Sequence, residues 1–180
     1  PLSLLLLGLS AWFCLHQLGL RPVACVLGGL AAALNMNAFS VGCWGLSGWD
    51  FSRAAFYVAL GVVASQRGLT GWLRAILGGL AVGVGLMDGV DVGALYSMYV
   101  AAFTVTLALI ADGTFALKLA RGVARTAVIA AFAALISAQT LTALISTQVV
   151  GVAGMRQDPQ TKERRWIEAT LWSLPKAEAL

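Results

Sequence analysis

Long apolar blocks dominate residues 2–150, and each is separated from the next by a short polar or glycine-containing stretch. The clearest blocks cover residues 2–20, 23–34, 51–65, 72–87, 92–111 and 126–150. A helix needs about 20 apolar residues to cross roughly 30 Å of hydrocarbon. Runs such as 127–136 do not alternate between apolar and polar residues, as the strands of a membrane barrel would. The pattern therefore predicts an all-α, polytopic transmembrane helix bundle of about six spans.

One or two of these helices are expected to be broken. After residue 34, polar residues and glycines interrupt the aromatic residues Phe39, Trp44 and Trp49. This mixture predicts a helix that ends early, followed by a re-entrant or interfacial stretch. The fourth block is short and runs into Asp88 and a glycine. A basic juxtamembrane helix that carries Lys118, Arg121 and Arg125 is expected to lead into the last span.

Composition agrees with this class. Hydrophobic residues make up 59% of the chain and charged residues 11%, and the mean hydropathy is +0.85. A soluble domain keeps roughly a quarter of its residues charged, so a water-soluble globular domain is excluded. The net charge of +4 follows from basic loops and an interfacial tail, and it does not predict a nucleic-acid partner. Cys14, Cys25 and Cys43 have no CxxC spacing and are expected to be packing residues.

Two regions and an orientation follow from the charges. Residues 1–150 are expected to form the transmembrane helical region, and 151–180 an extracytoplasmic amphipathic segment. Lys and Arg collect in the loops after the first, third and fifth blocks, whereas Asp50, Asp88 and Asp91 follow the second and fourth. Because basic loops stay in the cytoplasm, the acidic loops are expected on the outer side. Neither end carries a start or terminal feature, so we expect an internal fragment of a longer protein.

Asp88 and Asp91 are the most informative polar residues. Spaced by three positions, they would share one face of a helix and form a paired-carboxylate site at the outer mouth of the bundle. Such a site could hold a metal, accept hydrogen bonds from sugar hydroxyls or act as a general base. The simpler interpretation, which we favour, is a wet loop followed by the capped start of the next helix, where Asp suits the free amides and the dipole.

A second candidate site lies in the tail, where Arg164, Arg165 and Trp166 are adjacent. Arginine beside tryptophan suits an anionic amphipathic ligand such as a sugar-bearing lipid phosphate. The same residues suit a helix lying on lipid headgroups, which we favour. Asp50 and Arg53 are expected to neutralise each other at the interface. No Ser/His/Asp set, phosphate loop or metal-ligand spacing is present in the sequence, and the cofactor is left open.

Several stretches resemble the YfhO-like membrane proteins of bacteria. They are residues 23–35, Phe39-Ser40, Cys43-Trp44-Gly45, 80–94, 99–103, 161–166, Ala169-Thr170 and 172–176. Their order along the chain carries the resemblance. Members of this family are similar to GT-C glycosyltransferases, which transfer a sugar from a polyprenyl-phosphate donor on the outer face of the membrane.

The resemblance implies a role in cell-envelope glycosylation in the bacterial inner (cytoplasmic) membrane, with membrane lipids and a polyprenyl-phosphate sugar as partners. The catalytic acid of GT-C enzymes usually lies in a first outer loop, which would precede residue 1. The catalytic assignment of Asp88 and Asp91, and the phosphate contacts of Arg164 and Arg165, therefore rest on physical chemistry alone. A transporter or flippase element with ion-coupling carboxylates near a broken helix, or a non-catalytic scaffold, remains the alternative.

Overall fold

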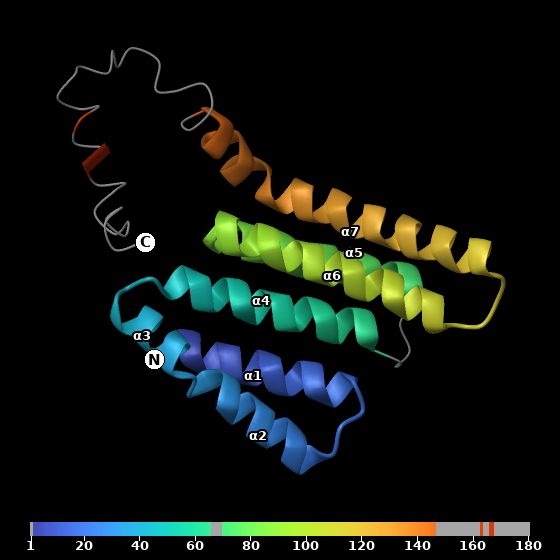
Figure 1. The fold of residues 1–180 in the computed structure, drawn as a ribbon, viewed down its shortest axis with the longest axis horizontal. Coiled ribbons are helices and arrows are strands. Elements are labelled where there is room, and N and C mark those ends of the chain that lie inside the picture. The colour runs from blue at the N-terminus through green and yellow to red at the C-terminus, as the bar shows by residue number, and fades with distance from the viewer. Residues whose placement is uncertain (1, 66–69, 147–162, 164–165, 168–180) are drawn as a thin grey trace, which may run out of the picture. The chain divides into compact units, whose positions relative to one another are not determined.

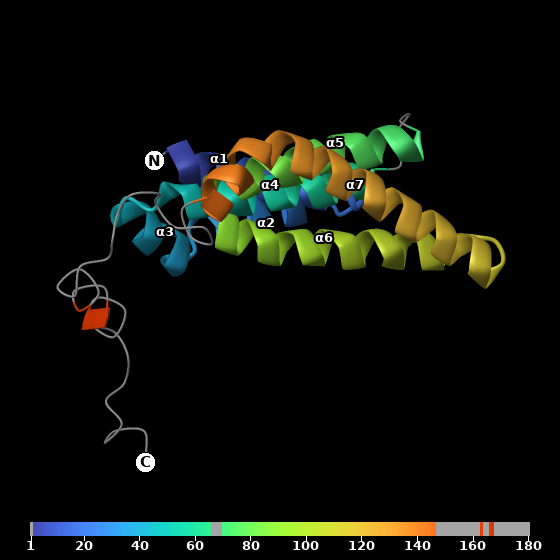
Figure 2. The same ribbon diagram turned by 90° about the horizontal axis from the view of Figure 1, so that it is seen from above.

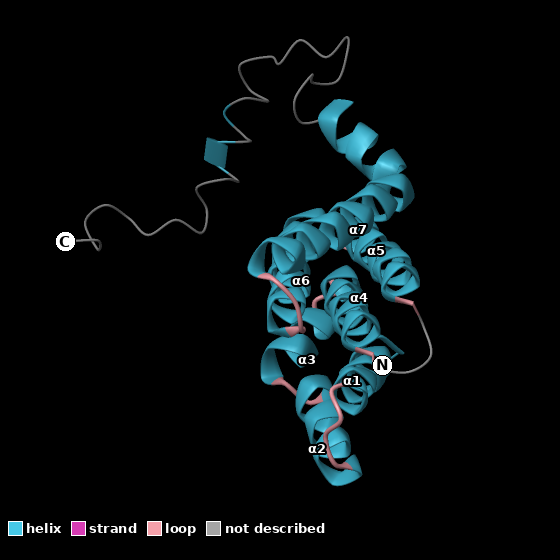
Figure 3. Ribbon diagram, turned by 90° about the vertical axis from the view of Figure 1, so that its right-hand side faces the viewer, coloured by secondary structure: helices cyan, strands magenta, loops and turns pink. Residues whose placement is uncertain are grey.

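Seven α-helices make up the computed structural model, which describes residues 2–65, 70–146, 163 and 166–167. In chain order they are α1 (Leu2–Gln17), α2 (Pro22–Ala33), α3 (Met36–Cys43), α4 (Ser47–Ala64), α5 (Gly71–Asp88), α6 (Val90–Ile110) and α7 (Phe115–Leu144). The described residues contain no strand (Figure 3). The predicted all-α class is confirmed.

Local sequence signals set the helix boundaries. Pro22 occupies the first turn of α2, and Arg21 before it is extended, as a residue preceding proline prefers. Gly19 has φ +81° in the turn that follows α1, a conformation that glycine adopts without steric cost. The side chain of Asn35 accepts a hydrogen bond from the backbone N–H of Asn37 at 2.9 Å and so caps α3.

Fewer helices meet the requirements for a membrane span than the sequence predicted. Among the described residues three helices are long and apolar enough, namely α5, α6 and α7, and a fourth span is added if α2 and α3 form one span with a 42° bend. The predicted number was about six. Helix α1 has only 16 residues, and α4 begins with a polar segment that contains Asp50, Ser52 and Arg53. The bend after α2 matches the predicted break, whereas the predicted basic juxtamembrane helix and the last span are one continuous helix, α7.

Residues 2–142 form one compact unit, in which successive long helices run side by side in opposite directions (Figures 1 and 2). Helix α4 lies at its centre and packs against α1, α3, α5 and α6. Its buried positions are mostly small residues: Ala54, Ala55, Ala59, Gly61 and Ala64. Small residues allow the close approach that drives helix association in lipid, where water exclusion contributes little.

Two ends of this unit differ in their charge. One end, where α3, the first turns of α4 and α6, and the last turn of α5 meet, is called the α3 end (Figure 1). The opposite, basic end holds the first turns of α2, α5 and α7. Asp50, Asp88 and Asp91 belong to the first and Arg74, Lys118 and Arg121 to the second, as the charge pattern predicted.

The helices carry apolar side chains on their exposed faces as well as on their buried faces. Leu5, Val23, Leu27, Met98 and Leu135 are each more than half exposed. Single exposed apolar residues are common on soluble proteins, but continuous apolar coverage marks a surface that meets lipid or another protein. Together with the three apolar helices, this surface identifies a membrane protein.

The second unit begins at Ala143, and only a few of its residues are described. The predicted extracytoplasmic segment, 151–180, lies outside the described residues except for Glu163, Trp166 and Ile167.

Candidate functional site

A polar network at the α3 end connects four residues, which come from α3, α4 and the position that precedes α3. Arg53 donates from Nη1 to Oδ1 of Asp50 at 3.3 Å and from Nη2 to Oδ1 of Asn37 at 2.6 Å. The capping bond of Asn35 to Asn37 extends the network by one residue. The guanidinium is therefore held in one orientation by partners on two helices.

The network is built on a buried carboxylate. The Asp50 side chain has no exposed surface, whereas that of Arg53 is 20% exposed. Within the described residues Asp50 Oδ2 has no hydrogen-bond partner, and the buried Ser3 of α1 faces the same carboxylate. A buried ion is stable only when a counter-charge lies beside it. Asp50 therefore positions Arg53, which presents the remaining part of its guanidinium outward.

Arg53 opens into a cavity of about 350 Å³ at the α3 end. Its polar lining comes from Asn35, Asn37, Arg53, Tyr57 and Tyr96, and Leu7, Ala32 and Ala38 complete it. Tyr96 stacks on Phe56 with a ring-centroid distance of 4.7 Å, which ties the α6 wall of the cavity to α4. An arginine, two amides and two tyrosines suit a ligand that combines an anionic group with hydroxyls.

An apolar groove of about 380 Å³ runs between α1 and α2. It is lined by Leu5, Gly8, Leu9, Trp12, Val26, Gly29, Leu30 and Ala33. Gly8 and Gly29 let the two helices touch, because a Cβ on Gly29 would lie 2.7 Å from the carbonyl oxygen of Gly8. The groove and the polar cavity both reach the last turn of α2, at Ala33 and Ala32 respectively.

The two predicted catalytic carboxylates are not on one helix face. Asp88 is the last residue of α5 and Asp91 lies in the first turn of α6, with Gly89 serving as C-cap of one helix and N-cap of the other. The pairing of Asp88 and Asp91 on one face required a continuous helix, and the break at Gly89 removes it. Asp91 sits where the dipole of α6 favours a carboxylate, although Gly89 and not an aspartate is the cap.

Neither carboxylate lines the polar cavity. Asp88 borders a separate cavity of about 270 Å³ whose other lining residues include Phe51, Val58 and Ala81. In the described part of the chain no group of three or more His, Cys, Asp or Glu residues is arranged to hold a metal ion. The paired-carboxylate site stays a prediction without a geometric counterpart.

The predicted phosphate-binding residues of the tail fall mostly outside the described part. Arg164 and Arg165 lie outside the described residues, and Trp166 belongs to the second unit, where its side chain is exposed. The sequence pattern predicted only that Asp50 and Arg53 neutralise each other at the interface. That ion pair is confirmed, but its burial beside Asn37 and a cavity came from the tertiary fold.

Comparisons of the chain with protein-family models, with curated proteins and with solved structures found no match.

Proposed function

We propose that this chain is the membrane-embedded part of a glycosyltransferase similar to the GT-C enzymes, and that the polar cavity at the α3 end receives the phosphate and sugar of a polyprenyl-phosphate donor. The observation that carries this proposal is the cavity lined by Arg53, Asn37 and Tyr96. The order of the sequence stretches that resemble YfhO-like proteins supports the same class.

The chemistry assigned to the cavity is stabilisation of a leaving phosphate. In the transfer step, an acceptor hydroxyl oxygen bonds to the anomeric carbon while the bond from that carbon to the phosphate oxygen breaks. The bond's electron pair leaves with the phosphate, and a carboxylate base takes the hydroxyl proton. Arg53, oriented by Asp50 and Asn37, would carry the growing phosphate charge. The base is assigned to the outer loop that the family resemblance implies.

The apolar groove between α1 and α2 supports a lipid-linked donor. Its lining is almost entirely apolar, and it reaches the same turn of α2 as the polar cavity. An isoprenoid chain in the groove would bring its phosphate towards Arg53. This arrangement requires the α3 end to lie on the outer side of the cytoplasmic membrane, as the positive-inside rule predicts.

Transfer of labelled sugar from a polyprenyl-phosphate donor in membrane vesicles tests the proposal. Arg53→Lys and Asn37→Ala should lower the transfer rate, the former by roughly a hundredfold, as with the loss of one transition-state donor. Arg121→Gln, at the basic end and exposed, is the matched control. Asp88→Asn and Asp91→Asn should leave transfer unchanged. Full transfer by inserted Arg53→Lys protein would contradict the assignment of Arg53.

One observation favours a second function, transport of a polar solute. The chain bends by 42° between α2 and α3, directly beside the buried ion pair. Broken helices next to charged residues line the substrate and ion sites of many transporters. A transporter site must be reachable from both sides of the membrane in turn, whereas a transferase site needs only the outer side.

Accessibility of the cavity separates the two functions. With Cys43→Ser to remove the exposed native thiol, an Asn37→Cys variant is labelled by a membrane-impermeant maleimide in right-side-out and inside-out vesicles. Labelling from the outer side alone agrees with a transferase. Labelling from both sides would favour transport.

A further inference from the structure

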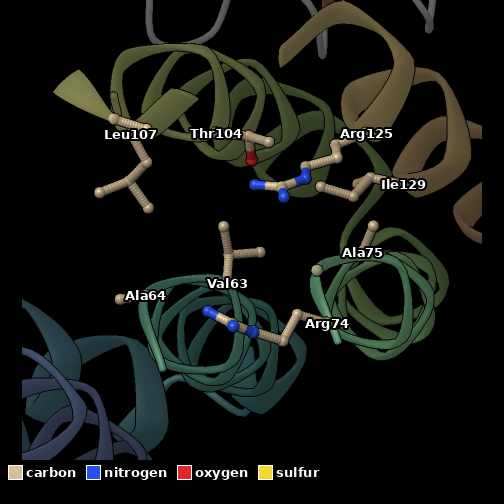
Figure 4. Close-up of a pocket in the computed structure, with 10 residues that line it drawn as sticks. Val63, Ala64, Arg74, Ala75, Thr104, Leu107, Arg125 and Ile129 are labelled. Carbon is tan, nitrogen blue, oxygen red and sulfur yellow. The ribbon is translucent and has the colours of Figure 1, made fainter. Parts of the chain in front are cut away.

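Two cavities of the unit are lined by arginine, and they differ in the side chains beside it. The cavity at the basic end has a volume of about 200 Å³ and is lined by Arg74 and Arg125. Thr104 is the only other described lining residue of this cavity whose side chain is polar (Figure 4). The cavity at the α3 end has two carboxamide groups beside its arginine, those of Asn35 and Asn37. The sequence contains no other asparagine.

The hydrogen bonds of the two carboxamides determine how each one is oriented. Oδ1 of Asn37 accepts from Nη2 of Arg53 at 2.6 Å, and Oδ1 of Asn35 accepts from the backbone N–H of Asn37 at 2.9 Å. A guanidinium and a backbone N–H can only donate, so the atom that faces each of them must be the carboxamide oxygen and not the nitrogen. The NH2 group of each asparagine is therefore the part left for a ligand.

The lining of this cavity is rich in donors and poor in acceptors. A guanidinium has five N–H groups and a carboxamide has two. Arg53 uses two of its five within the described residues, for Asp50 and Asn37, which leaves three. The two asparagine amides add two N–H groups each. The hydroxyl groups of Tyr57 and Tyr96 complete the polar lining, and no carboxylate belongs to it.

This surplus of donors favours a particular kind of sugar. A hydroxyl group donates as well as accepts, so it needs an acceptor for its own hydrogen, whereas an ionised carboxylate only accepts. Hydrogen bonds from neutral donors to a charged acceptor are stronger than those to a neutral one. Asn35 and Asn37 are exposed, so a carboxylate bound there keeps part of its water and the cost of removing the rest is reduced.

We propose that Asn35 and Asn37 select a donor whose sugar carries a carboxylate, that is, a uronic acid. The inference rests on the proposed function, because that function assigns the phosphate of the same donor to Arg53. The three N–H groups left on Arg53 serve the two unesterified oxygens of that phosphate. The amide N–H groups then serve the sugar carboxylate, and the tyrosine hydroxyls serve the hydroxyls of the ring.

Direct binding of soluble sugars tests the selection without requiring transfer. Purified whole protein in neutral detergent is titrated with methyl glucuronide or methyl glucoside at equal ionic strength, and thermal unfolding at each concentration gives the Kd. The two sugars differ only at C6, which is a carboxylate in one and a hydroxymethyl group in the other. Wild-type protein should bind the glucuronide about tenfold more tightly, the effect of hydrogen bonds to a charged group. Equal affinities would overturn the proposal.

The Asn35→Asp variant keeps the oxygen that caps α3 and replaces the amide donors by a second acceptor. It should remove the preference for the glucuronide. Ser40→Asp is the matched control, because it adds the same charge at an exposed position of α3 outside the cavity. Arg125→Gln removes a charge from the cavity at the basic end. Both should keep the preference, and its loss in Arg125→Gln but not in Asn35→Asp would overturn the assignment to the α3 end.

A transfer assay separates failure of this inference from failure of the proposed function. Membrane vesicles that contain the protein receive polyprenyl-phosphate glucuronate or polyprenyl-phosphate glucose. Faster transfer of glucuronate by the wild-type protein, with the preference lost in Asn35→Asp, supports both. Selective binding of the glucuronide without transfer from either donor supports the carboxylate site and contradicts the transferase. Equal rates from both donors would support the transferase and overturn the selection.

Discussion

Asp50 shows how one residue gains its role from burial. In the sequence it is an aspartate three positions before an arginine, a spacing that predicts a surface pair on a helix. In the fold the carboxylate has no exposed surface and the arginine keeps 20%. When one partner of such a pair is lost, water cannot solvate the buried charge that remains. Removing one partner therefore costs much more free energy of unfolding than removing one partner of a surface pair.

Loss of Arg53 should therefore destabilise the protein. Arg53→Ala leaves Asp50 charged, buried and without its partner, at a cost of about 3 kcal/mol, the low end of the range because Arg53 is partly exposed. The double variant Asp50→Asn/Arg53→Gln should recover most of this loss, because no buried charge remains. Thermal unfolding in detergent, followed by helical circular dichroism, measures the difference. Equal melting temperatures for Arg53→Ala and the exposed control Arg121→Ala would show that the pair contributes nothing.

At the scale of the helix, the glycines of α5 determine how closely its neighbours pack. A Cβ on Gly79 would lie 2.7 Å from the carbonyl oxygen of Ile129, and one on Gly83 would lie 2.7 Å from Cβ of Ile136. Both neighbours are on α7. On the α4 side, Ser52 adds a buried hydrogen bond of 2.5 Å to the carbonyl oxygen of Gly85. Close backbone contact and side-chain hydrogen bonds are the interactions that hold helices together in lipid.

Alanine at these glycines should separate α5 from α7. Gly79→Ala forces a methyl group against the backbone of α7 and should cost about 1–3 kcal/mol, the range for overpacking a filled interior. Gly42→Ala on α3 is a matched helical control, because its Cβ would meet only Asp50 Oδ2, at an ordinary 3.6 Å. The control should be neutral or slightly stabilising, since alanine favours helix over glycine. Melting temperatures in one detergent provide the comparison, and an unchanged Gly79→Ala value would argue against tight α5–α7 packing.

For the whole molecule, the arrangement of the helices determines which loops share a side of the membrane. Basic and acidic loops lie at opposite ends of residues 2–142 (Figure 1). The positive-inside rule then predicts that the basic end faces the cytoplasm. Cys43 at the end of α3 is exposed, whereas Cys14 and Cys25 are buried, so in the predicted orientation Cys43 is the native thiol expected to face the outer side.

In intact cells an impermeant maleimide should label the wild-type protein, and Cys43→Ser should abolish this labelling. A Cys43→Ser/Asp112→Cys variant should react only after the membrane is opened, because residue 112 lies in the loop between α6 and α7 at the basic end. Labelling of residue 112 of this variant in intact cells, together with no labelling of Cys43 in the wild-type protein, would mean that the orientation is reversed.

The class of the protein, the helical breaks and the separation of charge follow from local patterns along the chain. Continuous apolar blocks leave helices as the only way to satisfy the backbone in lipid, and glycine, proline and asparagine set where helices turn. The apolar pattern predicted more spans than the described residues contain. Apolar character alone does not distinguish a short or centrally packed helix, such as α1 or α4, from a helix that faces lipid.

Which polar residues meet depends on the tertiary structure. It separated Asp88 from Asp91 through the break at Gly89, and it brought Arg53 to Asn37, 16 residues apart in the chain. It also placed Arg74 and Arg125, 51 positions apart by their residue numbers, beside one cavity. Periodicity reports which residues share a helix face, but contacts between helices depend on packing and crossing geometry, which no local pattern encodes.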